Sequence, residues 1–147
     1  MDKKIILLVE DNPSDVALTR RAFEKSKIVN ELIAIEDGKE ALEYLQGAGK
    51  YSGRDRNILP IVVLLDIKLP LIDGITLLKT IRNDPRLRRL PVVMLTSSKE
   101  ESDLAESYDH GVNGFIRKPV CSREFEKTIE TFSLFWLLIN EPPPVVK

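Results

Sequence analysis

Four short apolar runs, with no polar residues inside them, constrain the fold of this chain most strongly. They are IILLV at 5–9, LIAI at 32–35, IVVLL at 61–65 and VVML at 92–95. A strand with one face in water alternates apolar and polar residues, whereas a strand covered on both faces can be apolar throughout. The runs therefore predict a parallel sheet with helices on both faces. A weaker run, GFIRK at 114–118, predicts a fifth strand.

Segments with helical periodicity separate these runs. Apolar residues recur in them three or four positions apart, which places those residues on one face of a helix. The first predicted helix follows three candidate N-cap residues, Asn12, Ser14 and Asp15, and continues to about Lys27; the last begins near Ser122. Strand and helix thus alternate five times. Right-handed crossovers then predict an α/β fold with a doubly wound, five-stranded parallel sheet in the flavodoxin-like order 2-1-3-4-5.

Length and composition fit one globular domain. The chain has 147 residues, of which 43% are hydrophobic, so it can bury a sizeable core. We expect a domain over residues 1–140 that ends in an extended helix, followed by a proline-rich tail at 141–147. The stretch QGAGKYSGRDRN at 46–57 predicts a long loop before the third strand.

Charge and hydropathy argue against two kinds of partner. The net charge is −1, so no strong field attracts nucleic acid or an anionic membrane, and we expect neither as a partner. The first residues lack the apolar stretch of a signal peptide, and no run approaches the roughly 20 residues that span a bilayer. With a single cysteine, Cys121, the chain fits a reducing compartment, and we expect a cytoplasmic protein.

Carboxylates follow two of the predicted strands directly. Glu10 and Asp11 end the first run, and Asp66 ends the third. In a doubly wound sheet, ligands bind beyond the carboxyl ends of the strands where the strand order reverses, here between strands 1 and 3. Two like charges about 4 Å apart repel by roughly 4 kcal/mol at an effective dielectric near 20. A hard divalent cation relieves this repulsion, and Mg²⁺ favours such carboxylates.

Complementary groups follow strands 4 and 5. Thr96 and Ser97 end the fourth run, and Lys118 ends the fifth. If Asp66 carries a phosphoryl group, Mg²⁺, Lys118 and Thr96 can share its three peripheral oxygens. Each residue alone has an ordinary explanation: a turn for Asp66, a helix cap for Thr96 and Ser97, a solvated side chain for Lys118. Their presence together at successive strand ends favours the phosphoryl site.

At this point the chain resembles the response-regulator receiver domains of two-component signalling. The resemblance covers about residues 4–135 and rests on VEDNPSD, LLDIKLPLIDG, VVMLTSS and GFIRKP, in that order. It implies Mg²⁺ ligands at Glu10, Asp11, Asp66 and the backbone carbonyl of Lys68. It also implies that Asp66 is the phosphoacceptor, and that a cis peptide bond precedes Pro119.

The resemblance further implies how the protein acts. Lys118 takes the role of the family's active-site lysine, Thr96 that of the switch hydroxyl and Phe115 that of the switch aromatic. Such a protein is a stand-alone response regulator rather than a metabolic enzyme, and it catalyses only its own phosphorylation and dephosphorylation. Its phosphoryl donor is a sensor histidine kinase or a phosphotransfer protein, and its output is contact with other proteins.

The end of the chain predicts self-association. LFWLLI at 134–139 is apolar around the whole circumference of a helix, so one face can pack on the sheet and the rest faces water. We expect a homodimer through this region; the alternative is a C-terminal cap that packs on its own chain. The long loop and this ending also resemble single-domain receivers paired with bacterial phytochromes and related kinases.

Other functions remain open from the residues alone. A flavodoxin-like electron carrier needs a phosphate-binding loop after strand 1, where this chain has EDNPSD. A metal-dependent phosphatase with an aspartate nucleophile usually has a second Asp where this chain has Lys68. A third alternative is a receiver-like dimeric scaffold that is never phosphorylated.

Overall fold

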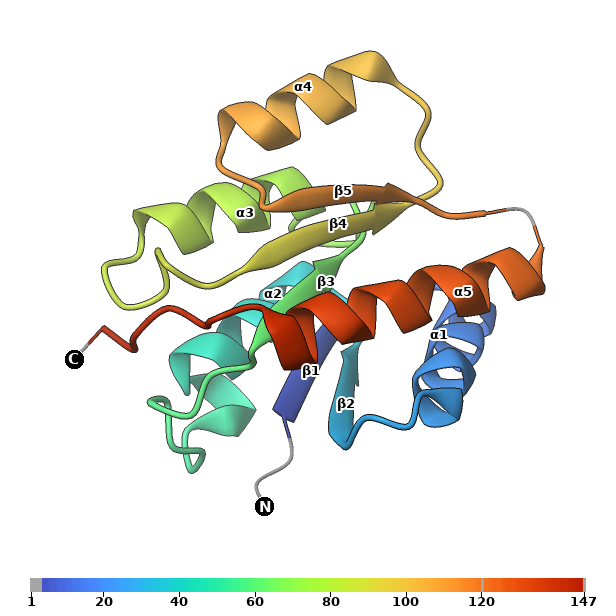
Figure 1. Ribbon diagram of the computed structural model, residues 1–147. Helices are drawn as coiled ribbons and strands as arrows, with labels where there is room; N and C mark the ends of the chain where they lie inside the picture. The colour runs from blue at the N-terminus through green and yellow to red at the C-terminus, as the bar shows by residue number, and fades with distance from the viewer. Residues whose placement is uncertain (1–3, 120, 147) are drawn as a thin grey trace.

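The protein folds into a five-stranded parallel sheet with helices on both faces (Figure 1). The computed structural model describes residues 4–119 and 121–146. The strand order is β2-β1-β3-β4-β5, and every paired neighbour is parallel. The predicted fold is therefore confirmed. The strands are β1 (Lys4–Val9), β2 (Asn30–Ile35), β3 (Val62–Leu65), β4 (Val92–Thr96) and β5 (Gly114–Arg117), and the helices are α1 (Pro13–Lys25), α2 (Gly38–Gln46), α3 (Gly74–Asn83), α4 (Glu101–Asp109) and α5 (Ser122–Ser133).

Successive strand residues point into two separate apolar cores, one on each face of the sheet. Leu7 and Val63 join one core, together with residues of α2 and α3. Ile6 and Leu64 join the other, together with residues of α1 and α5. In Figure 1, α1 and α5 lie side by side, and the Phe23 and Phe132 rings of these helices meet edge to face. Burial on both faces explains why the strand sequences lack polar alternation.

The first three helices follow the carboxyl ends of the strands that precede them, α1 and α2 after short turns and α3 after the longer 66–73 loop. Each has a side chain at its N-cap that accepts hydrogen bonds from backbone N–H groups of the first turn. The capping residues are Asn12, Asp37 and Asp73. Of the three candidates for the first helix, Asn12 is thus the cap. These caps fix the helix starts around the edge of the sheet where the acidic residues lie.

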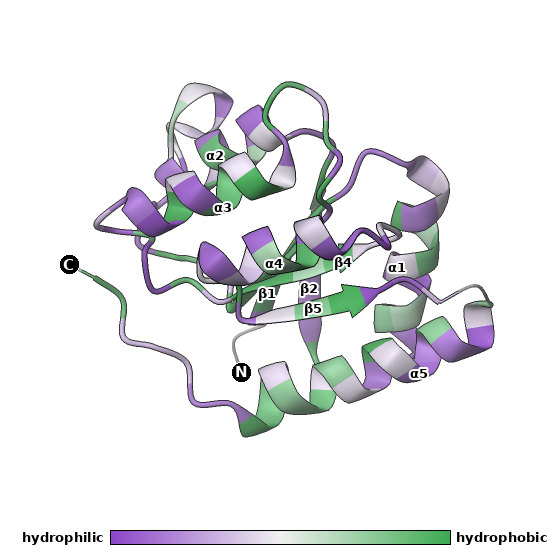
Figure 2. Ribbon diagram, turned by 90° about the horizontal axis from the view of Figure 1, so that it is seen from above, coloured by the Kyte–Doolittle hydropathy of each residue, from purple (hydrophilic) through white to green (hydrophobic). Residues whose placement is uncertain are grey.

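The last helix continues past α5 as a π-helical segment, η2 (Leu134–Ile139). Sequence periodicity did not predict this change of helix type. Leu137 is fully buried, whereas Leu134, Phe135, Leu138 and Ile139 are exposed. Figure 2 shows hydrophobic residues around this end of the helix. The helix ends at Ile139, before the proline run.

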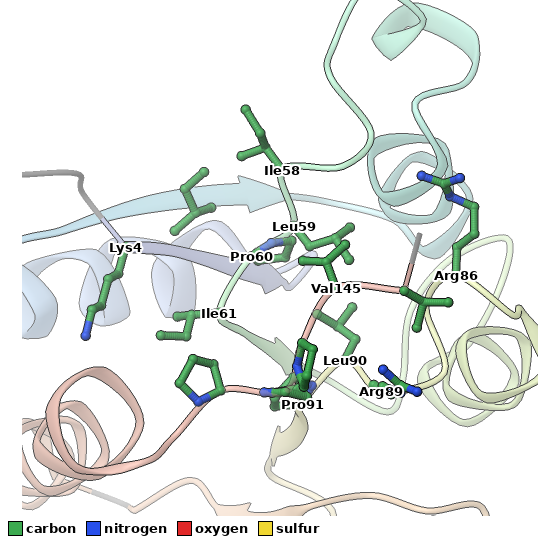
Figure 3. A pocket seen from close by; sticks show the side chains of 15 residues that line it. Lys4, Ile58, Leu59, Pro60, Ile61, Arg86, Arg89, Leu90, Pro91 and Val145 are labelled. Carbon is green, nitrogen blue, oxygen red and sulfur yellow. The ribbon is translucent and has the colours of Figure 1, made fainter.

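The segment after η2 continues in the direction of α5 and lies beside the amino ends of the strands, at the opposite end of the sheet from the acidic residues (Figure 1). There it encloses a pocket of about 320 Å³ with the residues that lead into β3 and β4 (Figure 3). The lining is largely apolar, and Lys4, Arg86 and Arg89 are its charged members. This pocket lies at the other end of the strands from the acidic residues.

The 46–57 loop contains one short 3₁₀ turn, η1 (Gly49–Tyr51).

Among the described residues, no helix has the length and hydrophobicity that crossing a membrane requires.

Candidate metal and phosphoacceptor site

Three carboxylates from β1 and β3 converge at the carboxyl edge of the sheet. Glu10, Asp11 and Asp66 each offer an oxygen that lies within 4.8 Å of the other two. The register of the sheet explains this: Val9 pairs with Leu65, and the Asp66 N–H donates to the Val9 carbonyl over 3.1 Å. The residues that follow this pair therefore leave the sheet side by side. The sequence prediction that these acids meet is confirmed.

The three acids differ in their exposure to solvent. Glu10 is 2% exposed and Asp66 is 8% exposed, whereas Asp11 is open to solvent. The Asp66 Oδ1 atom accepts a hydrogen bond from the Ile67 N–H over 2.7 Å. The cluster thus combines two buried carboxylates with one that a hydrated ion can approach from outside.

Lys118 enters the same site from the end of β5. Its Nζ lies 3.2 Å from Asp66 Oδ2 and also donates to Glu10 Oε1. The Lys118 N–H donates to the Thr96 carbonyl over 2.8 Å, which fixes the backbone from which the side chain reaches the acids. Only 11% of the Lys118 side chain is exposed. Its charge is therefore directed at the acidic cluster rather than at solvent.

Burial and charge shift the pKa values of this pair. Burial raises the pKa of Glu10 to about 7, and the charge of Asp66 adds to the effect, although the hydrogen bond from Lys118 opposes it. For Lys118, burial lowers the pKa, but hydrogen bonds to Glu10 and Asp15 and the charge of Asp66 outweigh burial. Its pKa therefore lies above the ordinary value, and the ammonium stays charged at neutral pH.

Thr96 lies at the end of β4, the strand next to β3. It is 1% exposed, and its Oγ1 accepts a hydrogen bond from the Ser98 N–H over 3.1 Å. Glu100 precedes α4 as its N-cap residue, so Thr96 and Ser97 do not cap that helix. Phe115 is half-buried and packs against the core on the α3 side of the sheet.

The loop between β3 and α3 adds two features. Lys68 is exposed two residues after Asp66, and Leu71 is 78% exposed with a φ of 68°. The peptide bond before Pro119 is the second point at which the resemblance can be checked. No peptide bond is cis among residues 4–119 and 121–146. The Lys118–Pro119 bond is therefore trans, and the expectation of a cis bond is wrong. The trans form is the lower-energy isomer even before proline.

Sequence reasoning missed the contacts of two residues at this site. Asp15, considered only as a cap candidate, lies 2.9 Å from Lys118 Nζ. Gly74 lies so close to Asp66 that a Cβ atom placed on it would be 2.1 Å from the Asp66 carbonyl oxygen. The DG pair at 73–74, directly before a helical pattern, was the one sequence signal that could have drawn attention to Gly74.

Comparison with known proteins identifies the family. Residues 6–130 match the family described as the response regulator receiver domain. The chain belongs to this family. Receiver domains are signalling proteins that bind a divalent metal at an acidic pocket and interact with histidine kinases or phosphotransfer proteins. The acidic cluster of this receiver supports a phosphoacceptor role, and the electron-carrier and scaffold alternatives are not favoured.

The alignments with individual relatives cover nearly the whole length of this receiver. It is 40% identical over 142 residues to the probable methanogenesis regulatory protein FilR2 of Methanothrix harundinacea, covering 97% of this chain and 89% of that protein. It is 39% identical over 134 residues to the response regulator Rcp1 of Synechocystis sp., covering 91% of this chain and 89% of Rcp1.

Two solved structures show the same fold. A crystal structure of the Mn²⁺-bound form of Rcp1 aligns with a TM-score of 0.87 and 38% identity, over 96% of this chain and 99% of that one. The crystal structure of the phosphorylated cyanobacterial phytochrome response regulator RcpA aligns with a TM-score of 0.89 and 37% identity, over 97% and 100% of the two chains.

Proposed function

We propose that this receiver accepts a phosphoryl group on Asp66, with Mg²⁺ held by Glu10, Asp11, Asp66 and the backbone carbonyl of Lys68. The observation that supports this most is the convergence of three carboxylates with the Lys118 ammonium at one sheet edge. Oxygen donors of this kind, with one carboxylate open to solvent, suit Mg²⁺, which keeps part of its water shell. The residues present therefore fit the ion.

The remaining chemistry belongs to side chains of this chain. When bound, the metal ion neutralises charge on the phosphoryl oxygens. An Asp66 carboxylate oxygen attacks phosphorus, and the phosphorus–nitrogen bond of a phosphohistidine donor breaks as the new phosphorus–oxygen bond forms. Lys118 lies 3.2 Å from Asp66 Oδ2 in the structure, so its ammonium is placed to contact a peripheral phosphoryl oxygen. We propose that the protein catalyses its own phosphorylation and dephosphorylation and no metabolic reaction.

Thr96 and Phe115 supply the proposed switch. The Thr96 oxygen now accepts a hydrogen bond from the Ser98 N–H, and a phosphoryl dianion gives the hydroxyl a strong acceptor for its own hydrogen. Movement of Thr96 toward Asp66 opens space beside β4, and Phe115, only half-buried, moves into it. The surface formed by α4, β5 and α5 is thereby repacked and presented to partner proteins.

Partners and assembly follow from the relatives and from the surface. The phytochrome response regulator RcpA among the similar structures supports a phytochrome-type sensor histidine kinase as the phosphoryl donor. The exposed side chains of Leu134, Phe135, Leu138 and Ile139 form an apolar surface, and burying it in a homodimer removes it from water. We place the protein in the cytoplasm, with its kinase.

The decisive experiment is incubation with acetyl phosphate and Mg²⁺, followed by intact-mass measurement. The native chain is expected to gain the mass of one phosphoryl group, and EDTA is expected to prevent the gain. The Asp66→Asn substitution removes the nucleophile and is expected to abolish the mass gain. Asp109→Asn, the same change at an exposed position on α4, serves as the matched control. Phosphorylation of the Asp66→Asn variant at the native rate would refute the assignment.

A further inference from the structure

Among residues 4–119 and 121–146, the Lys118 ammonium has three carboxylate partners, and one of them lies outside the metal cluster. Glu10 and Asp66 belong both to the cluster and to the lysine contacts. Asp15 Oδ2 lies 2.9 Å from Lys118 Nζ, but the cluster formed by the described residues does not include Asp15. Two of the three anchors of the lysine are therefore oxygens for which a divalent cation competes.

Local structure holds Asp15 in place independently of the metal. Its backbone N–H donates to Asn12 Oδ1 over 3.2 Å, and its carbonyl accepts from the buried Thr19 hydroxyl over 2.7 Å. The carboxylate therefore extends from the first turn of α1 with little backbone freedom. Its side chain is 36% exposed, compared with 11% for Asp66, so it is the carboxylate at the solvent side of the lysine.

A bound cation changes which contacts the lysine can keep. Once the oxygens of Glu10 and Asp66 coordinate a metal ion, they are less available to the ammonium. A lysine side chain has a flexible four-carbon stem, so an ammonium without a partner moves through many conformations. Asp15 is the contact that remains.

We propose that Asp15 is a positioning residue that keeps the Lys118 ammonium beside Asp66 when a divalent cation occupies the site, and that it thereby sets the rate of phosphoryl uptake. This inference rests on the proposed function and adds a residue to it. An ammonium already held in position has less freedom to lose when it contacts the phosphoryl group, so the transfer is faster. Because Asp15 is partly exposed, we expect a moderate effect, about three- to fivefold on the rate.

A mutant cycle with acetyl phosphate and Mg²⁺ tests the inference. Asp15→Asn is expected to slow phosphorylation about three- to fivefold, while Asp15→Glu, which keeps the charge, recovers part of the rate. In a Lys118→Ala background, Asp15→Asn is expected to cause no further slowing, because the residue acts through the lysine. Glu24→Gln, an equal charge change at an exposed position of the same helix, leaves the rate unchanged.

A second measurement needs neither metal nor phosphate. In EDTA, urea unfolding of the single and double variants is expected to show non-additive effects of Asp15→Asn and Lys118→Ala, since the two side chains are in contact. Equal slowing by Asp15→Asn with and without Lys118, or additive unfolding effects, would overturn the positioning role alone. Failure of the native chain to take up phosphate would overturn the proposed function as well, so the two failures are distinguishable.

Discussion

The carbonyl oxygen of Asp66 lies so close to Gly74 that it leaves no room for a Cβ atom at position 74. A Cβ atom on Gly74 would be 2.1 Å from that oxygen. The Gly74 N–H also donates to the Ile67 carbonyl over 2.7 Å, which ties the start of α3 to the loop after β3. The position of Asp66, the proposed phosphoacceptor, therefore depends on a residue without a side chain.

Gly74→Ala is expected to lower both stability and phosphoryl uptake. The added methyl group forces the backbone at Asp66 and α3 apart, and we expect the free energy of unfolding to fall by about 1–3 kcal/mol. Displacement of Asp66 also slows phosphorylation by acetyl phosphate. Urea unfolding and intact-mass kinetics measure the two effects. Gly53→Ala is the matched control, because nothing lies within 4 Å of a Cβ atom there; equal behaviour of the two variants would contradict the prediction.

Mg²⁺ affinity is expected to rise with pH and then level off. The pKa of Glu10 is about 7, so below that pH a proton competes with the metal ion for this carboxylate. Isothermal titration calorimetry is expected to show affinity increasing up to about tenfold per pH unit below pH 7 and little above it. Glu10→Gln, which carries no titrating proton, loses both affinity and this dependence. An unchanged pH profile in that variant would count against the role of Glu10.

Without metal, the same group is expected to make stability fall as pH rises. The pKa of Glu10 is raised from 4.5 to about 7 in the folded protein, so between these values the folded state binds more protons than the unfolded state. The contribution of Glu10 to the free energy of unfolding is complete below about pH 4.5 and is lost as pH rises through 7. Between these values the free energy of unfolding falls by up to about 1.4 kcal/mol per pH unit. Unfolding in EDTA at several pH values, with Glu10→Gln for comparison, measures it; equal slopes for both proteins would refute it.

Leu138→Glu is expected to disrupt the proposed homodimer without unfolding the protein. Leu138 is 59% exposed, so the substitution adds charge to the surface and little strain to the core. Sedimentation at tens of micromolar, a range set by ordinary interface affinities, is expected to show a dimer for the native chain and a monomer for the variant. Val29→Glu, which adds the same charge at another exposed apolar residue, 55% exposed and just before β2, is the control. A native monomer, with or without acetyl phosphate, would argue against self-association.

The sequence predicted most of the sheet and the residues at its carboxyl edge. Unbroken apolar runs predicted β1, β3 and β4, because burial on both faces removes polar residues from a strand. Glu10 and Asp66 could be placed in one site because each directly follows a strand, and parallel strands end at the same edge. Such predictions succeed where a local pattern and a general rule of topology together fix the position of a side chain.

Other features required the tertiary structure. The reach of Asp15 to Lys118 joins residues 103 positions apart, and no local pattern distinguishes it from a helix-capping role. The π-helical turn at η2 and the burial of Leu137 beside the exposed Leu138 depend on how the last helix packs on the sheet. The trans bond before Pro119 likewise differs from what the resemblance implied.

By itself, the sequence determined which segments are strands and helices, their order in the sheet, and the three acids and one lysine that end its strands. The strands and helices follow from the periodicity of apolar residues along the chain, and the meeting of their ends follows from the general geometry of parallel strands. Only the tertiary structure decided how far each side chain reaches, which carboxylates share the Lys118 ammonium, and why position 74 has no room for a side chain. The reason is physical: contact distances arise when distant segments pack together, and no single segment contains that information.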